Sequence, residues 1–162
     1  MAANNDPPLI SAVLAEDIVE CRRLIDTGEA NVNGDRSQSG WTALHEASIR
    51  GYLEISELLT LSGADVNIRN SNGNTALHYA YSYLKIVQLL LCQGADISFK
   101  NNSGYTALDL ASPHDRLKEV ADCLRKWPWT MAIIITLKEN LAIYHLLDAS
   151  TIIDLWQYLG NQ

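Results

Sequence analysis

The stretch Gly40–Ala47, which reads GWTALHEA, decides the fold because versions of it occur three times along the chain. It returns as GNTALHYA at Gly73–Ala80 and, more altered, as GYTALDLA at Gly104–Ala111. The leading glycines are 33 and then 31 residues apart. Self-similarity at a period of about 20–50 residues predicts a stack of like supersecondary units, because one unit cannot bury its apolar face alone.

The repeated Thr-x-Leu-His-x-Ala core and the period near 33 residues resemble the ankyrin repeat. The resemblance covers residues 8–126 of the 162 in the chain. It implies an all-α fold, an ankyrin-repeat solenoid of four helix-turn-helix repeats with finger-like hairpin loops between them. The expected repeats lie at residues 8–39, 40–72, 73–103 and 104–126. Residues 1–7 should form a disordered N-terminus, and residues 127–162 an apolar C-terminal extension folded as a helical hairpin.

Each repeat should contain an inner helix, a turn and an outer helix. In the second repeat Thr42 is a good N-cap, and His45 stands three residues later, where its ring can bond back to the threonine. In the first repeat Pro8 fits the first helical position, the outer helix should run over Asp17–Ile25, and Gly28 suits a left-handed helix end.

Two copies depart from the pattern. The third repeat is two residues shorter, and the missing pair falls in the turn at Tyr81–Leu84, where no glycine remains. We therefore predict a shortened inner helix or a distorted turn there. The fourth repeat has Asp109 where the others have histidine. A carboxylate in the first turn of a helix interacts favourably with the helix dipole, so this helix should still form.

The charge balance argues against two classes of partner. The formal net charge is -7, with 12 Lys and Arg against 19 Asp and Glu. A protein that neutralises phosphates needs a basic face, so we expect neither nucleic acid nor an anionic membrane surface as a partner. Met1–Asp6 has no basic region followed by an apolar one, and the three cysteines lack CxxC spacing. We expect a reduced compartment, the cytoplasm or alternatively the nucleus.

The polar residues do not form an enzyme motif. His45 and His78 invite a metal or acid–base interpretation, but each recurs with its threonine at a helix start, so repeat architecture explains both. No spacing brings Ser, His and Asp or Cys and His together, and the chain has no Gly-rich phosphate loop. We therefore expect a non-catalytic protein with no cofactor and no metal site.

Asn67 is a candidate modification site. Leu59 and Asp65–Asn67 match the Leu, acidic, Val/Ile and Asn spacing seen in ankyrin repeats that resemble substrates of asparaginyl hydroxylation. The alternative is an asparagine that only shapes its loop, and this is the interpretation that we favour.

By resemblance, partner proteins dock on the concave wall that the fingers and inner helices form. Trp41 and Tyr105 occupy equivalent places after the finger glycine of repeats two and four, and aromatic residues and arginine most often carry binding energy. The alternative for Trp41 is that it packs against a neighbouring finger. We predict a non-catalytic module that binds a protein partner through this wall. The expected partner-binding residues are Gln38, Trp41, Ile49, Arg50, Arg69, Ser71, Asn72, Asn74, Tyr79, Ser82, Tyr83, Lys100, Asn102 and Tyr105.

The C-terminal extension leaves three interpretations open. Its many apolar residues suit a cap on the open end of repeat four, or a homodimer through residues 130–159. Thr136–Leu141 and Leu155–Leu159 faintly resemble a suppressor-of-cytokine-signalling box, although the Cys and Leu-Pro-Leu-Pro elements of that box are missing. The alternative function is thus an adaptor whose repeats bind a client while its tail recruits other machinery, such as a ubiquitin ligase. Met131–Leu137 also fits a strand, with helix favoured.

Overall fold

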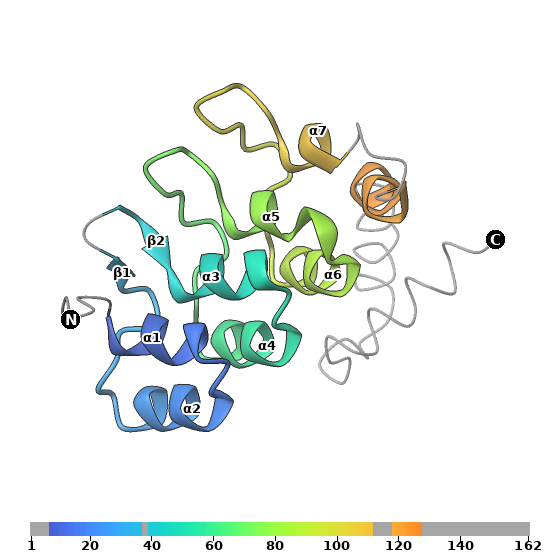
Figure 1. Ribbon diagram of the computed structural model, residues 1–162. Coiled ribbons are helices and arrows are strands. Elements are labelled where there is room, and N and C mark those ends of the chain that lie inside the picture. Colours follow the sequence, from blue (N-terminus) through green and yellow to red (C-terminus); the bar gives the residue numbers. More distant parts are fainter. Residues whose placement is uncertain (1–6, 37–38, 112–117, 128–162) are drawn as a thin grey trace, which may run out of the picture.

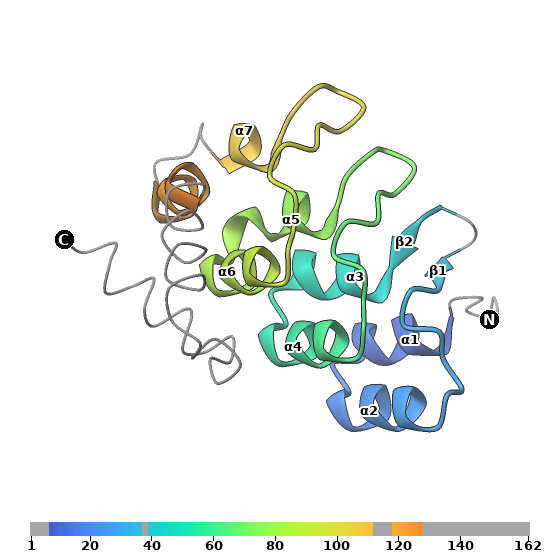
Figure 2. The same ribbon diagram turned by 180° about the vertical axis from the view of Figure 1, so that it is seen from behind.

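The computed structural model describes residues 7–36, 39–111 and 118–127, and in them pairs of antiparallel helices stack in one row (Figure 1). The finger loops leave the stack on the same side as one another (Figure 1). The view from behind shows α2, α4 and α6 following the same row next to α1, α3 and α5 (Figure 2). The helical solenoid expected from the repeated stretch is confirmed.

Inner and outer helices alternate along the chain. The inner helices are α1 (Pro8–Leu14), α3 (Ala43–Arg50), α5 (Ala76–Tyr79) and α7 (Ala107–Ala111). The outer helices are α2 (Ile18–Asp26), α4 (Leu53–Leu61), α6 (Leu84–Cys92) and a helix at residues 118–127. Strands β1 (Asp35–Arg36) and β2 (Trp41–Thr42) pair antiparallel in the first finger, with Asp35 opposite Thr42. The second and third fingers, residues 68–75 and 99–106, lead into α5 and α7.

The core lies between the two helices of each pair and between neighbouring pairs. Leu44 on α3 and Leu59 on α4 are almost completely buried. Burial of a leucine side chain contributes about 1.5–3 kcal/mol, so these positions account for much of the stability of the stack. Ala47, Ala80 and Ala111 occupy the same place in three repeats and are fully buried. The small side chain of Ala47 lets α3 pack against α1, α4 and α5.

The third repeat is distorted where its two residues are missing. α5 ends at Tyr79 and continues as a single 3-10 turn, η1 (Ala80–Ser82), before α6 begins. The predicted shortening of this inner helix is confirmed. Gly51 ends α3 in the left-handed conformation with φ of 80°, and the Tyr83 ring packs directly on it.

The helix ends of the first repeat follow the sequence closely. Pro8 is the first residue of α1, as predicted. The outer helix runs over Ile18–Asp26, one residue later at each end than predicted, because Asp17 is its N-cap. The Asp17 carboxylate accepts a hydrogen bond from the backbone N–H of Glu20 at 2.9 Å. Gly28 has a φ of 71°, which confirms the left-handed helix end.

Several expectations fall outside the described residues and stay predictions. They concern the disordered N-terminus, Gln38, and the C-terminal extension from residue 128 with its hairpin and its homodimer surface at residues 130–159. The helix at residues 118–127 reaches Trp127, one residue beyond the expected end of the fourth repeat. Trp127 is buried.

Candidate functional site

The two histidines of the repeated stretch connect successive repeats. The backbone N–H of Thr42 donates to Nδ1 of His45 at 3.1 Å, so the proton of the neutral ring is assigned to Nε2. Nε2 then donates to the backbone carbonyl of Asn74 in the next finger, at 3.1 Å. His78 repeats this arrangement with Thr75 and with the carbonyl of Tyr105. Burial lowers the pKa of both histidines, and the neutral ring that results is part of the scaffold.

In the fourth repeat Asp109 forms the hydrogen bonds to the threonine that the histidine forms in the other two repeats. The backbone N–H and the hydroxyl of Thr106 both donate to Oδ2 of Asp109, each at 2.8 Å. The backbone N–H of Asp109 donates back to the threonine hydroxyl at 3.2 Å. These hydrogen bonds lower the pKa of Asp109, so the carboxylate stays ionised and caps α7. The expected helix is present.

An asparagine shapes each of the second and third fingers. The side-chain oxygen of Asn70 accepts from the backbone N–H groups of Asn72 and Asn74, both at 3.0 Å. Asn101 does the same for Ser103 and Tyr105, again at 3.0 Å. A side chain that satisfies two backbone donors fixes the turn, because a buried unpaired N–H costs about 1–3 kcal/mol. The same pattern of hydrogen bonds therefore fixes the turns of the second and third fingers.

Hydrogen bonds also join one finger to the next. The backbone N–H and the side-chain amide of Asn102 donate to the carbonyls of Asn72 and Ser71, both at 2.9 Å. Nη2 of Arg69 donates to the carbonyl of Lys100 at 2.9 Å. The N–H of Ser71 donates to the carbonyl of Ser39 in the first finger at 2.7 Å. These hydrogen bonds thus hold the three fingers together in a row.

Trp41 is half-buried and belongs to a packed cluster. Its ring lies over His45 with centroids 5.6 Å apart, and it meets Tyr79 edge-on at 4.9 Å. Its indole N–H donates to Oε2 of Glu46 at 2.9 Å. Glu46 is only 4% exposed and also accepts from Nε of Arg50. These contacts are with the inner helices α3 and α5, whereas the packing interpretation placed Trp41 against a neighbouring finger.

Tyr105 has a different environment from its counterpart Trp41. Its side chain is 53% exposed, whereas its backbone is held on both sides. Its N–H donates to Asn101 at 3.0 Å and its carbonyl accepts from His78 at 3.1 Å. The structure therefore presents an exposed aromatic ring on a fixed backbone.

The predicted partner-binding residues fall into three groups. Trp41, Asn74 and Tyr79 are half-buried, and Gln38 lies outside the described part of the chain. Ile49, Arg50, Ser82 and Tyr83 are exposed at the turn ends of the inner helices. Arg69, Ser71, Asn72, Lys100, Asn102 and Tyr105 are exposed on the fingers.

The partner-binding residues expected from the sequence leave out three residues that organise this face. Asn70 and Asn101 hold the fingers, and Glu46 joins Trp41 to Arg50. A signal for the asparagines existed, because they are 31 residues apart, as are the glycines that begin the last two copies of the repeated stretch. Nothing in the sequence marks Glu46 as buried.

Asn67 connects two repeats through the segments that follow the outer helices α4 and α6. Its side-chain N–H₂ donates to the carbonyl of Gly94 at 3.0 Å, and its oxygen accepts from the N–H of Asp96 at 2.9 Å. Asn33 makes the same pair of bonds to Gly63 and Asp65 one repeat earlier. The loop-shaping interpretation of Asn67 therefore has a structural basis.

The described residues form neither a membrane span nor a metal cluster. In that part of the chain, the helices are too short or too polar to cross a membrane. The same residues contain no group of three or more His, Cys, Asp or Glu side chains placed to hold a metal ion.

The chain is similar to known proteins along its repeats. A family model described as "Ankyrin repeats (3 copies)" matches it at residues 1–70 and 55–127. The 2-5A-dependent ribonuclease of Homo sapiens is 40% identical over 74 residues, which are 46% of this chain and 10% of that protein. Protein phosphatase 1 regulatory subunit 12A of Mus musculus is 50% identical over 44 residues, 27% of this chain and 4% of that protein. Ankyrin repeat and SOCS box protein 3 of Bos taurus is 46% identical over 50 residues, 31% of this chain and 10% of that protein.

The chain covers a tenth or less of each of these relatives, so the similarity concerns the repeats. Ankyrin repeats generally mediate interactions between proteins, and they are typically non-catalytic. A regulatory subunit is among the relatives, and the match to the ribonuclease is a partial one. Because the family model extends over residues 1–127 and the structure repeats the same helix pair along them, the chain belongs to the ankyrin-repeat family.

Proposed function

We propose that this chain is a non-catalytic module that binds a partner protein through the face built from the fingers and the inner helices. The observation that carries the proposal is the exposed ring of Tyr105 on a backbone fixed by Asn101 and His78. A rigid aromatic side chain supplies a large contact area at a low cost in conformational entropy. Such residues are frequent among those that dominate binding energy.

The bracing between fingers supports the same proposal. Asn102 and Arg69 already use their donors to tie neighbouring fingers together, so the tips are ordered before a partner arrives. A surface that is ordered in advance loses less entropy when it binds, which favours affinity. Ser71, Asn72 and Lys100 remain exposed around this row and can pair with polar groups of the partner.

A capture experiment tests this proposal. The full chain is immobilised and incubated with cell extract, and bound proteins are quantified by mass spectrometry for the wild type, for Tyr105→Ala and for Leu61→Ala. Leu61 lies on α4 and is 80% exposed, so its variant is a control for the loss of an exposed apolar side chain elsewhere. A specific partner should be lost with Tyr105→Ala and kept with Leu61→Ala. Equal retention by both variants would contradict the proposed face.

The second candidate function is an adaptor. One relative is named for ankyrin repeats together with a SOCS box, which matches the alternative that the sequence left open. The tail that would recruit a ubiquitin ligase or form a homodimer begins at residue 127, and its structure past that residue is not described. Capture by the full chain and by residues 1–127 separates the two candidates, because only the adaptor loses a set of partners while it keeps its client.

Hydroxylation of Asn67 remains a proposal about the same stack. Asn33 provides a control within the molecule, because its side chain makes the same two hydrogen bonds to the next repeat. Peptide mass spectrometry of the protein purified from cells should show the gain of one oxygen atom at Asn67 and not at Asn33. Unmodified Asn67 in cells with an active asparaginyl hydroxylase would reject the proposal.

A further inference from the structure

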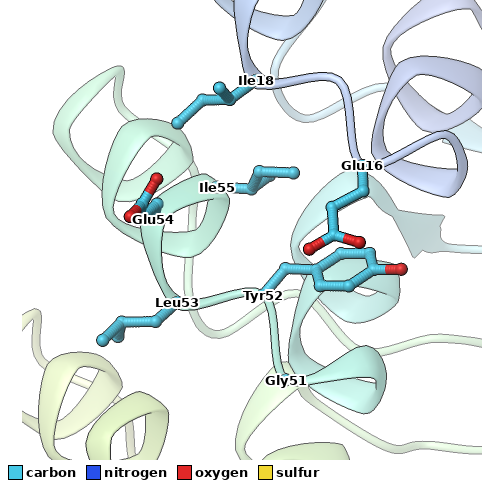
Figure 3. A pocket seen from close by; sticks show the side chains of 7 residues that line it. All are labelled: Glu16, Ile18, Gly51, Tyr52, Leu53, Glu54 and Ile55. Atoms are coloured by element: carbon cyan, nitrogen blue, oxygen red, sulfur yellow. The ribbon is translucent and has the colours of Figure 1, made fainter.

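A pocket opens at the turns that join inner to outer helices, at the opposite end of the inner helices from the fingers. It lies between the first and second repeats and has a volume of about 360 Å³. Figure 3 shows the side chains around it. Its walls are Glu16 and Ile18 from the first repeat and Gly51, Tyr52, Leu53, Glu54 and Ile55 from the second.

The pocket has a cause in the repeat pattern, because Glu16 stands where the next repeat has a glycine. Glu16 and Gly51 both follow an inner helix in the left-handed conformation, with φ of 56° and 80°. Among the described residues, Glu16 is the only one other than glycine with a positive φ. This conformation is unfavourable for a residue with a Cβ.

At the next junction along the stack, the corresponding space is filled by a side chain. There the ring of Tyr83 packs on Gly51 so closely that an added Cβ would collide with it. Tyr52 has the same place as Tyr83, since each is the N-cap of its outer helix. Tyr52 cannot pack on Glu16 in that way, because Glu16 carries a side chain. The space between these two repeats is therefore left open.

The walls combine negative charge, an aromatic ring and apolar surface. Figure 3 shows the Glu16 carboxylate beside the Tyr52 ring, and Glu54 in the first turn of α4 with Ile55 between the two acidic residues. Both carboxylates are exposed, and neither forms an ion pair with a described residue. The nearby cation Arg50 is paired with Glu46. The pocket thus has two negative charges that the described part of the chain does not neutralise.

We propose that this pocket binds an arginine side chain of a partner protein. A guanidinium group can stack on the Tyr52 ring and donate paired hydrogen bonds to the Glu16 carboxylate. The methylene groups of the same side chain would cover the apolar wall, which includes Ile18 and Ile55. A lysine ammonium is more strongly hydrated and does not stack, so it suits this half-open aromatic pocket less well. The site is a second docking surface, separate from the fingers.

A titration followed by NMR tests the site. The full chain, labelled with ¹⁵N, is titrated with N-acetyl-arginine amide, with N-acetyl-citrulline amide, which has the same shape without the charge, and with N-acetyl-lysine amide. The amide signals of residues 51–55 should shift and saturate with the arginine compound, with a dissociation constant on the order of millimolar for one isolated side chain. Citrulline and lysine should bind roughly tenfold more weakly or not measurably.

Variants of the chain separate this site from general effects of charge and stability. Glu16→Gln and Glu54→Gln should each weaken arginine binding by roughly tenfold. Glu57→Gln is the matched control, because Glu57 is exposed on the same helix and does not line the pocket. Glu16→Gly should remove binding and at the same time raise the thermal midpoint, because glycine adopts the left-handed conformation freely. If Glu16 only stabilised the fold, Glu16→Gly would lower the thermal midpoint instead.

Several results would overturn the proposal. They are the absence of saturable shifts, equal binding of the citrulline compound, equal or tighter binding of the lysine compound, and an effect of Glu57→Gln as large as that of Glu16→Gln. A Glu16→Gly variant with an unchanged titration would also overturn it. None of these results depends on whether a partner docks on the fingers, so the two proposals can fail separately.

Discussion

Mild acid should destabilise the stack through His45 and His78. Both rings are buried, and burial lowers the pKa of each below the ordinary value of about 6.5. In the unfolded chain they titrate near that ordinary value. Above about pH 6.5 both states are neutral, and the stabilising contribution is fully present. As the pH falls below that value, only the unfolded state takes up protons, so the free energy of unfolding decreases until the folded pKa is reached.

The structure gives the reason why the folded rings resist protonation. A proton on Nδ1 of His45 would point at the backbone N–H of Thr42, which donates to that atom at 3.1 Å. For a histidine that titrates at about 6.5 when unfolded, the loss in the free energy of unfolding between about pH 7.5 and 5.5 has an upper limit of about 1.4 kcal/mol, reached when the folded ring takes up no proton. For the two histidines together the upper limit is about 2.7 kcal/mol, a large part of the stability of a small domain.

The assay is urea unfolding of the full chain, followed by circular dichroism at the two pH values. The chain itself provides the control, because the fourth repeat builds the same box with Asp109, whose pKa is lowered by Thr106. The variant His78→Asp removes one of the two buried imidazoles and should show about half of the wild-type pH dependence. Wild-type stability that is flat over this range would refute the reasoning, and so would a His78→Asp variant with the full wild-type dependence.

Three further changes test the packing of the fingers and turns. In the same urea assay, Trp41→Ala should lower the free energy of unfolding by about 2–3 kcal/mol, because it removes ring contacts and an indole hydrogen bond. Tyr105→Ala, which removes an exposed ring, should change that free energy by no more than about 0.5 kcal/mol. Gly51→Ala should cost clearly more than Gly63→Ala in thermal unfolding, because both have positive φ but only Gly51 has a ring packed on it. Asn70→Ala should cost about 1–3 kcal/mol and speed amide exchange in the second finger, since two backbone N–H groups lose their acceptor.

Local signals made most of the helices predictable. Thr42 and Gly51 mark the two ends of α3, and the structure places a capping box and a left-handed glycine there. The two-residue deletion before Leu84 correctly indicated the short α5, because the repeat offers a full-length copy for comparison. The ends of α3 were predictable because each depends on residues within one turn of the position concerned.

The contacts between repeats were not predictable in the same way. Glu46 looks like an ordinary exposed helix residue in the sequence, but Trp41 and Arg50 cover it and hold its carboxylate. The bonds of Asn102 reach Ser71, 31 residues away, and depend on how far one repeat turns relative to the next. Local sequence patterns and helix propensities do not determine that rotation, so the environment of each surface residue could not be predicted from the sequence.

A repeat protein offers copies of itself against which each exception can be compared. Asp109 departs from the pattern but restores the cap, and the shortened third repeat departs from it but still places Tyr83 beside Gly51. Glu16 does neither, since it holds an unfavourable backbone conformation and leaves a pocket open. Proteins break local rules mostly where a function benefits from the exception. Glu16 is therefore the position at which stability and binding should move in opposite directions, and Glu16→Gly is the change that can show it.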